Sequence, residues 1–416
     1  MNRALLLLLA PTSMSALTLA GYTFTTSMGA TWAGMDTYLA GMSNASRHQD
    51  WAATLAFYQS VDPLTSVSLS QLPALMNPAH PYAMLTGSYW PGQTSHGDTL
   101  VRQAIGGTGA VLDWNDKSRR ELLTKAAAYE VVRQYVMNRV ESGVAKCNAG
   151  ASGAVDDWEV AYALHSGSLE GTDGSGSGKS TYALGDKRKG QFLTYAPSGT
   201  AVHSANQRVL DAMLAGVTAL GAGDCRAAYA ARSSILSGLT TPLLQGMLRE
   251  AYEIAPDGAH AADGIEEVAE GWAFTAAFLP QLTACNATVG ELVATNMALS
   301  LTPTNGAHVA SGFATIKAGV ESTYDCLRVS CADVGGMVDT DGAYLAGFLP
   351  CAESTTAASG DAVVAATVVL AVLTAVFLIT TLALVCYILA QRREPPPASA
   401  AKSTATKEVT LTSSPH

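Results

Sequence analysis

Residues 362–390 form a run of 29 positions without one charged side chain. About 20 apolar residues are enough for a helix to cross a bilayer core, so this run predicts a transmembrane helix. Arg392 and Arg393 follow directly, and positive residues next to a span stay on the cytoplasmic side. Residues 391–416 are rich in Pro, Ser and Thr and too poor in apolar residues to fold, which predicts a disordered cytoplasmic tail.

The start of the chain carries a second topological signal. Arg3 precedes a short run of leucines, and small residues follow up to Ala20, the pattern of a secretory signal peptide over residues 1–20. The sequence therefore predicts a type I single-pass protein of the plasma membrane. Its domains are an ectodomain of residues 21–351, facing the extracellular or periplasmic side, and a juxtamembrane linker of residues 352–361.

Cysteine usage fits an oxidising compartment. Cys386 lies in the predicted span, and the other six fall in the external region, so three disulfides are expected. Spacing leaves their pairing open, although Cys326 and Cys331 are close enough for a local loop. Asn44 and Asn286 begin Asn-Ala-Ser and Asn-Ala-Thr sequences, which predicts glycosylation outside the cell. The disulfide candidates are Cys147, Cys225, Cys285, Cys326, Cys331 and Cys351.

The charge balance argues against nucleic acid as a partner. The chain has 34 acidic and 24 basic residues, a net charge of −10. A protein that binds nucleic acid needs a basic surface to neutralise phosphates. The acidic excess instead favours cations or cationic surfaces.

Apolar residues recur with the period of a helix, which predicts a mainly α-helical ectodomain with long irregular loops. The clearest helix is residues 115–147, where Asn115 is the expected N-cap and Leu122, Ala126 and Tyr129 begin the apolar stripe. Its basic residues are read as a solvated face. Further helices are predicted for residues 48–60, 155–169, 201–220, 224–236, 241–254, 263–279, 290–299 and 310–330.

Two segments combine acids with aromatic, Ala-rich sequence, and they predict a site for a hard metal ion. Glu267 and Glu270 have a spacing that lets both carboxylates reach one cation. The two segments are expected to face a common cleft. The alternative is that these acids form solvated first turns, where the helix dipole favours them. The candidate ligands are Asp156, Asp157, Glu159, Tyr162, His165, Glu170, Glu267 and Glu270.

Other motifs give weaker signals. Residues 174–180 resemble a phosphate-binding loop, but Asp173 stands where the first glycine is needed, no strand precedes the loop, and residues 181–185 make a poor start to a long helix. A flexible Gly/Ser loop is the better interpretation. His260 and Asp263 could share a metal if they lay on one helix, but Asp263 is better explained as an N-cap. No zinc-hydrolase, nucleophile-elbow or Cys-x-x-Cys motif is present.

Four sequence blocks also resemble a known family. In order they begin Gly167-Ser168-Leu169-Glu170, Tyr182-Ala183-Leu184-Gly185-Asp186, Thr241-Pro242-Leu243-Leu244-Gln245 and Ala269-Glu270-Gly271-Trp272. Their succession over residues 155–300 resembles the algal iron-assimilating proteins, which include the low-iron-inducible periplasmic proteins and the diatom phytotransferrins. Lys189 stands where many relatives are expected to have a cysteine, so that disulfide is not expected here.

The resemblance implies binding and uptake of ferric iron, Fe(III), at the cell surface, with carbonate as a co-bound anion in phytotransferrins and with an endocytic or reductase partner receiving the iron. No catalysis is expected. A bound anion needs cationic donors, and the candidates are Lys187, Arg188 and Arg249. Two other functions remain open from the residues alone: a metal-dependent ectoenzyme, and a helical adhesion or receptor ectodomain.

Overall fold

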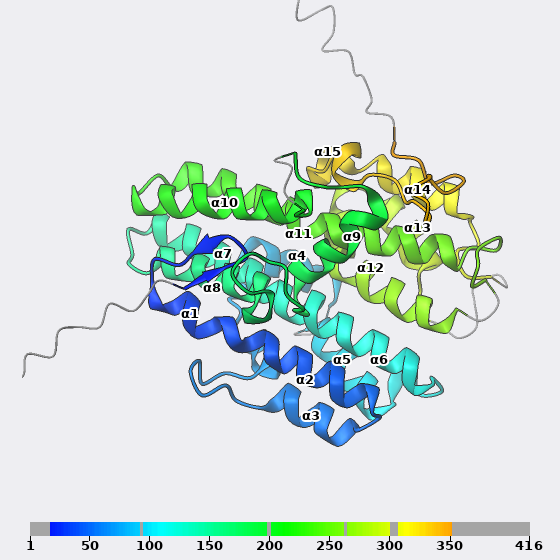
Figure 1. The fold of residues 1–416 in the computed structure, drawn as a ribbon, viewed down its shortest axis with the longest axis horizontal. Coiled ribbons are helices and arrows are strands. Elements are labelled where there is room, and N and C mark those ends of the chain that lie inside the picture. The colour runs from blue at the N-terminus through cyan, green and yellow to red at the C-terminus, as the bar shows by residue number, and fades with distance from the viewer. Residues whose placement is uncertain (1–16, 92–94, 198–200, 262–263, 300–306, 352–416) are drawn as a thin grey trace, which may run out of the picture. The chain divides into compact units, whose positions relative to one another are not determined.

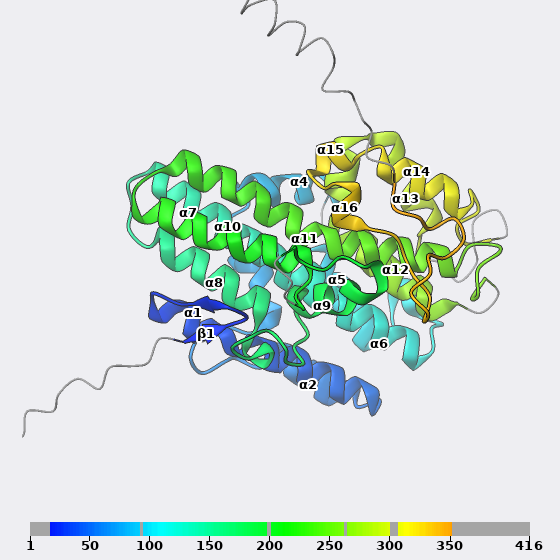
Figure 2. The ribbon, with the colours of Figure 1, turned by 45° about the horizontal axis from the view of Figure 1, so that its top comes forward.

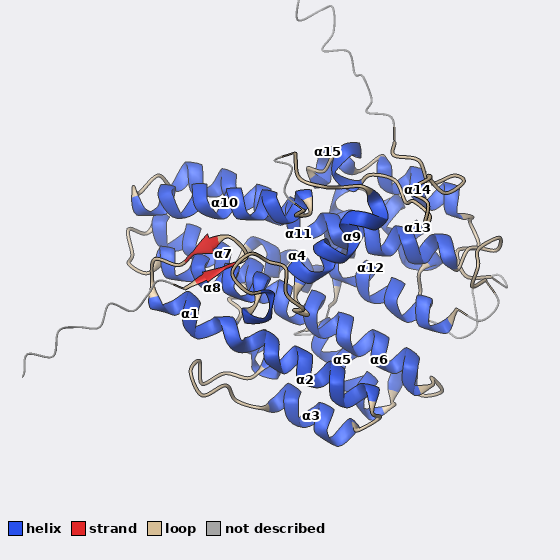
Figure 3. Ribbon diagram, in the orientation of Figure 1, coloured by secondary structure: helices blue, strands red, loops and turns tan. Residues whose placement is uncertain are grey.

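The computed structural model describes residues 17–91, 95–197, 201–261, 264–299 and 307–351. These residues form a mainly helical fold, as predicted (Figure 3). Apart from isolated β-bridges, the described residues contain one sheet, the antiparallel pair β1 (Thr18–Leu19) and β2 (Tyr22–Thr23). No helix within these ranges is long and apolar enough to span a membrane. The predicted signal peptide up to residue 16, linker, transmembrane helix and tail lie outside the described residues.

The helices divide into an N-terminal and a C-terminal series along the chain (Figure 1). The first series is α1 (Ser27–Trp32), η1 (Ala33–Met35), α2 (Asp36–Arg47), α3 (Trp51–Gln59), η2 (Leu69–Leu75), α4 (Pro81–Tyr89), α5 (His96–Gly106), η3 (Gly109–Val111), α6 (Asp116–Lys125), η4 (Ala126–Val132), α7 (Arg133–Asn148), α8 (Ala154–Ser166) and η5 (Ser168–Glu170). The second is α9 (Thr181–Phe192), α10 (Ser204–Gly221), α11 (Cys225–Glu253), α12 (Ile265–Cys285), α13 (Ala287–Asn296), α14 (Phe313–Glu321), α15 (Tyr324–Leu327) and α16 (Cys331–Val334).

The helix predicted for residues 115–147 is continuous but not regular. Asn115 caps it, because its side-chain oxygen accepts a hydrogen bond from the Ser118 amide at 2.9 Å. Between α6 and α7, however, η4 adopts π-helical geometry over seven buried residues. Such wide turns are rare and frequently occur at functional sites. The π-helix lies between Lys125 and Arg133, and its central residue is Tyr129.

Helix α11 replaces the two helices predicted for residues 224–236 and 241–254. It runs unbroken through Gly238 and Pro242. A Cβ atom at Gly238 would lie 2.6 Å from a methyl carbon of Val209 in α10, so glycine permits the close approach of these two neighbouring helices (Figure 2). In the turn before Pro242, the hydroxyl groups of Thr240 and Thr241 donate to backbone carbonyls.

Two helices beside the later site are not among those predicted. α2 contains Asn44 and was not assigned any structure from sequence, and α9 begins where residues 181–185 argued against a long helix. The prediction for α9 was wrong because Tyr182, Leu184 and Phe192 are buried against the rest of the fold. Tertiary packing, rather than local propensity, stabilises a helix of this kind.

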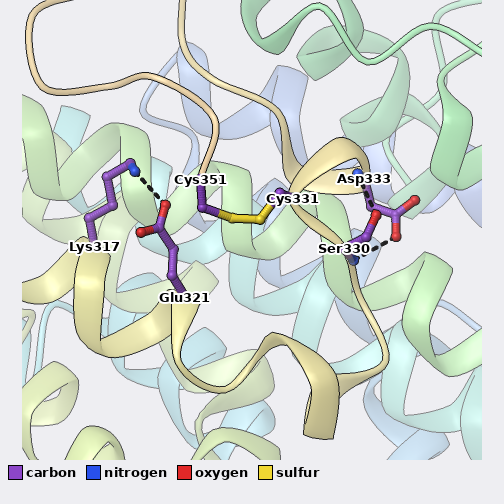
Figure 4. The surroundings of a disulfide bond; sticks show 6 residues. All are labelled: Lys317, Glu321, Ser330, Cys331, Asp333 and Cys351. Atoms are coloured by element: carbon purple, nitrogen blue, oxygen red, sulfur yellow. Dashed lines mark hydrogen bonds and ion pairs between the residues drawn. A yellow bond between two sulfur atoms is a disulfide. The ribbon is translucent and has the colours of Figure 1, made fainter. Parts of the chain in front are cut away.

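Three disulfides form, as predicted. They join Cys147 to Cys225, Cys285 to Cys326, and Cys331 to Cys351. Cys326 and Cys331 therefore do not form a local disulfide with each other, because Cys326 pairs with Cys285 and Cys331 pairs with Cys351. Figure 4 shows Cys331–Cys351, which fastens the last described residues to α16.

The two predicted glycosylation asparagines are both exposed. Asn44 lies within α2. Asn286 is the N-cap of α13, where its side-chain oxygen accepts from the amides of Thr288 and Val289.

The segment directly after residue 16 is part of the folded core. Tyr162 donates a hydrogen bond to the Ala20 carbonyl at 2.9 Å, and the Ala20 amide donates to the Gly171 carbonyl at 2.9 Å. Leu19 and Tyr22 are buried. Residues 17–20, which the sequence places at the end of the signal peptide, thus hold α8 and η5 in position.

Candidate functional site

The acids at the start of α8 serve the fold in different ways. Asp157 is fully buried, forms ion pairs with Arg139 and with Lys146 (2.9 Å for the latter), and accepts a hydrogen bond from Ser142. Asp156 is partly exposed in the first helical turn, where the dipole favours a negative charge. Neither residue lines a cleft shared with the second acidic segment.

Glu159 is a buried anchor for the N-terminal segment. Its two carboxylate oxygens accept hydrogen bonds from the Tyr22 hydroxyl at 3.1 Å, from the amide and hydroxyl of Thr25 at 2.6 and 2.7 Å, and from the amide and hydroxyl of Thr26 at 2.7 and 2.6 Å. Five donors on one carboxylate leave little capacity for a metal ion. Glu159 instead connects α8 to the residues that precede α1.

Tyr162 and His165 are also enclosed in the core. Burial raises the pKa of Tyr162 and lowers the pKa of His165 to about 3. His165 Nδ1 lies 2.7 Å from the Thr181 hydroxyl oxygen. The sequence prediction that Tyr162 and His165 face a cleft is therefore not matched by their positions.

Glu170 lies at the end of η5, under the Gly/Ser loop. Asp36 positions η5 by accepting bonds from the Ser168 hydroxyl and the Leu169 amide. The loop folds back over it, since the amides of Gly176 and Ser177 donate to the carbonyls of Glu170 and Leu169 at 3.0 Å each. A Cβ atom at Gly178 would lie 2.3 Å from Glu170 Oε1, so a larger residue there would displace the Glu170 carboxyl group.

Glu170 is 2% exposed, and no described residue makes a hydrogen bond of normal geometry to its Oε1. Burial, and after it the nearby Asp186, raises the pKa of Glu170 to about 7, although the nearby Gly178 amide favours the ionised carboxylate and lowers its pKa. An acid with this pKa is partly ionised at neutral pH. It is available to a cation that displaces the proton.

Glu270 approaches the same region from α12. Its Oε1 accepts from Lys125 Nζ at 3.0 Å, and its Oε2 is buried without a partner in the part of the chain that the structure describes. Lys125 also pairs with Glu121. Burial alone would raise the pKa of Glu121, but Lys125 and Arg120 outweigh it and hold that pKa below its ordinary value. These pairs fasten α6 to α12.

Glu170 and Glu270 line one cleft of about 550 Å³. The helices α2, α6, α9 and α12, together with η4, η5 and the Gly/Ser loop, supply its walls. Figure 1 labels these four helices. Its charged and phenolic side chains are Arg47, Arg120, Glu121, Lys125, Tyr129, Glu170, Lys179, Asp186, Lys187 and Glu270.

Tyr129 brings a phenol to this cleft from the π-helix. Its ring stacks on Phe274 with a centroid distance of 5.6 Å, and its hydroxyl makes no hydrogen bond to a described residue. Burial raises the pKa of Tyr129 to about 12. The phenol is therefore neutral at neutral pH unless a metal ion displaces its proton.

Of the predicted anion-binding residues, only Lys187 lines the cleft. Arg188 is fully buried, with its guanidinium 5.3 Å from the Phe274 ring centroid and one nitrogen 3.7 Å from Glu250 Oε1. Arg249 pairs with Glu250 at 2.5 Å and with Glu253 at 2.6 Å. Both arginines thus neutralise carboxylates within the fold.

A second cluster lies beyond Arg249. Ligand atoms of Glu253, His260 and Glu267 all fall within 4.8 Å of one another, and His260 Nε2 is 3.9 Å from a Glu267 oxygen. Glu267 and Glu270 consequently point to different neighbours, although their spacing on α12 suggested one shared cation. Arg249 already neutralises Glu253, which weakens this cluster as a cation site.

The cleft thus contains two of the eight predicted metal ligands, one from each acidic segment. Sequence analysis missed Tyr129, because it fits the apolar stripe of its helix, and Lys125, because a charged helical residue is usually solvated. It also set aside Lys179 with the Gly/Ser loop. The one sequence signal for these three residues was the glycine-rich motif of residues 174–180, which contains Lys179.

Comparisons of the chain with models of protein families, with curated proteins and with solved structures found no match.

Proposed function

We propose that this protein binds ferric iron in the cleft and serves iron uptake at the cell surface, with the metal as its cargo and no catalytic turnover. The observation that carries the proposal is that Glu170 and Glu270 line one cleft, and that each has a buried carboxylate oxygen, Oε1 and Oε2 respectively, without a hydrogen-bond partner among the described residues. A buried carboxylate oxygen left unpaired is unfavourable. A hard trivalent cation supplies the missing partner.

The other side chains of the cleft suit a ferric ion with a companion anion. Tyr129 offers a phenol, whose proton a bound metal ion displaces although its pKa is about 12. Lys179 and Lys187 offer positive charge to carbonate. The same combination of metal and anion is what the resemblance to iron-assimilating proteins implies. Membrane anchoring through residues 362–390 belongs to this proposal.

Ferric binding by the full-length protein in detergent micelles tests the proposal. Iron is supplied as a weak chelate, with and without bicarbonate, and binding is followed by equilibrium dialysis and visible absorption. We expect tight binding and a charge-transfer band from the Tyr129 phenolate. The double variant Glu170→Gln, Glu270→Gln should bind iron about 100-fold more weakly, which corresponds to roughly 3 kcal/mol. Tyr129→Phe should remove the band.

The second cluster supplies a matched control. His260→Gln with Glu267→Gln changes two potential ligands outside the cleft and should leave the affinity and the band intact. If this variant loses iron and the cleft variants keep it, the assignment to the cleft is wrong. Absence of tight ferric binding in the unmodified protein would remove the proposed function. Turnover of a metal-dependent substrate would then favour an ectoenzyme, and its absence a receptor or adhesion domain.

A further inference from the structure

The cleft is larger than a ferric ion and carbonate require. Its volume is about 550 Å³, within the range of roughly 300–1,000 Å³ that is usual for small organic ligands. An ion with carbonate has five heavy atoms, which fill on the order of 150 Å³ if each takes about the 30 Å³ of a liquid water molecule. The remaining space suits a larger ligand.

The charges in the cleft are not balanced within the protein. It is lined by five basic and four acidic side chains, in a chain whose net charge is −10. Glu121 and Glu270 share Lys125, Glu121 also pairs with Arg120, and Asp186 pairs with Lys189 outside the cleft. Three cations, Arg47, Lys179 and Lys187, have no ion-pair partner within the described ranges.

These three cations come from separate elements. Arg47 is the last residue of α2, Lys179 belongs to the Gly/Ser loop, and Lys187 lies on α9. Lys179 is close enough to Glu170 to favour its ionised form. Lys187 interacts electrostatically with Glu270 and Lys125. The unpaired positive charges therefore lie on the same walls as the unpaired carboxylate oxygens.

This arrangement discriminates between types of ligand. A bare anion near Arg47, Lys179 and Lys187 would be repelled by Glu170 and Glu270. A bare cation near Glu170 and Glu270 would be repelled by the three basic side chains. A ligand that carries a metal ion on one side and several carboxylates on another satisfies both sets of groups.

We propose that iron enters the cleft as a chelate of a small multicarboxylate anion, of the hydroxycarboxylate class. Arg47, Lys179 and Lys187 hold the carboxylates of that anion, and Glu170 and Glu270 face the metal. This inference rests on the proposed function, because it takes the same cleft and specifies the chemical form in which iron binds there. No covalent bond changes, and the iron remains ferric.

Calorimetric titration of the full-length protein tests the form of the ligand. The probes are ferric citrate, ferric iron with bicarbonate, and inorganic phosphate as a competitor. The triple variant Arg47→Gln, Lys179→Gln, Lys187→Gln changes only exposed side chains, so the fold should persist, as circular dichroism can verify. We expect it to bind ferric citrate at least about 30-fold more weakly. Arg226→Gln, at an exposed basic residue of α11 outside the cleft, is the matched control and should stay within about twofold.

The outcomes separate the two proposals. Ferric citrate binding that depends on the three cations supports the inference. If iron binds with bicarbonate and citrate only withdraws it from the protein, the proposed function stands and the inference is overturned. Equal binding of ferric citrate by the triple variant, or its displacement by phosphate at equal concentration, also overturns it. If neither ferric form binds to the unmodified protein, both proposals fail.

Discussion

Glu170 and Glu270 line the same cleft, and each has one carboxylate oxygen buried without a partner among the described residues. They arrive there from different elements, Glu170 from the short helix η5 and Glu270 from the long helix α12. The Gly/Ser loop encloses the first, and an ion pair with Lys125 orients the second. The predictions below follow from this site and from the contacts that support it.

Glu170 sets the expected pH dependence of iron binding. Its pKa of about 7 means that at lower pH a proton occupies the carboxyl group and must leave when a cation binds. The ferric affinity should therefore fall by up to about tenfold per pH unit between pH 7 and pH 5. The measurement is the ratio of the ferric affinity of the unmodified protein to that of Glu170→Gln at each pH. Hydrolysis of the ferric ion lowers both affinities equally, so it does not change this ratio. A constant ratio would contradict the role of Glu170.

The same group affects folding of the iron-free protein. The pKa of Glu170 is raised from 4.5 in the unfolded chain to about 7 in the fold, so the folded state holds this proton more tightly. Its contribution to stability is full below pH 4.5 and is lost as the pH rises to 7. Glu170→Gln removes this loss and should stabilise the iron-free protein at pH 8 by about 1–2 kcal/mol, after allowance for screening. Urea unfolding at pH 4.5 and pH 8 measures the difference.

Glu159 should matter for stability rather than for iron. In Glu159→Gln an amide group faces the donors of Tyr22, Thr25 and Thr26, so at least one buried donor loses its acceptor. We expect a loss of about 2–4 kcal/mol in the free energy of unfolding, with the ferric affinity unchanged. Asp156→Asn, on the same helix but partly exposed, is the control and should change stability by less than about 0.5 kcal/mol. Equal effects of the two substitutions would argue against the anchoring role.

The disulfide pairing can be checked directly by peptide mapping without reduction. We expect peptides that link Cys147 to Cys225, whereas a peptide joining Cys326 to Cys331 would contradict the pairing. The Cys147–Cys225 bond closes a loop of 78 residues. Replacing both cysteines with serine should lower the free energy of unfolding by about 2–4 kcal/mol. Chemical denaturation of the double variant gives that value.

The mature protein should retain residues 17–20. Cleavage after Ala20 would remove β1 and the carbonyl that accepts the Tyr162 hydrogen bond. If the proposed signal peptide is removed, we expect cleavage before Leu17, and mass spectrometry of the N-terminal peptide of the mature chain can verify the position. A mature N-terminus at Gly21 would show that the fold does not need this strand.

Sequence periodicity predicted the helical class because most helices bury one apolar stripe, but it failed where burial extends around the helix. The sequence predicted a break between helices at residues 237–240, yet in α11 Gly238 permits contact with Val209 and the helix continues. The packing partner on α10 is distant in sequence, so no local pattern reveals it. Helix α9 was missed for the same reason, because it is stabilised by packing against segments that are distant in the sequence.

The candidate site was only partly predictable for a related reason. Acids, a tyrosine and a histidine are residue types that can bind a metal ion, but their partners in the fold decide which remain available. Glu159 accepts hydrogen bonds from the N-terminal segment, and both oxygens of Asp157 form ion pairs, whereas Glu170 and Glu270 each keep one oxygen without a hydrogen bond or ion pair among the described residues. Tyr129 reaches the cleft from the π-helix, whose wide turn was not anticipated from the apolar spacing.

The bond between Cys331 and Cys351 protects the C-terminal end of the domain from unfolding under tension. Tension applied to the chain at Cys351 passes through a covalent link to Cys331 at the start of α16, so residues 332–350 lie in a closed loop that bears none of it. A domain held at that end could be pulled by flow or by membrane movement without unravelling from its C-terminal side. Only reduction of the disulfide would expose that loop to the load.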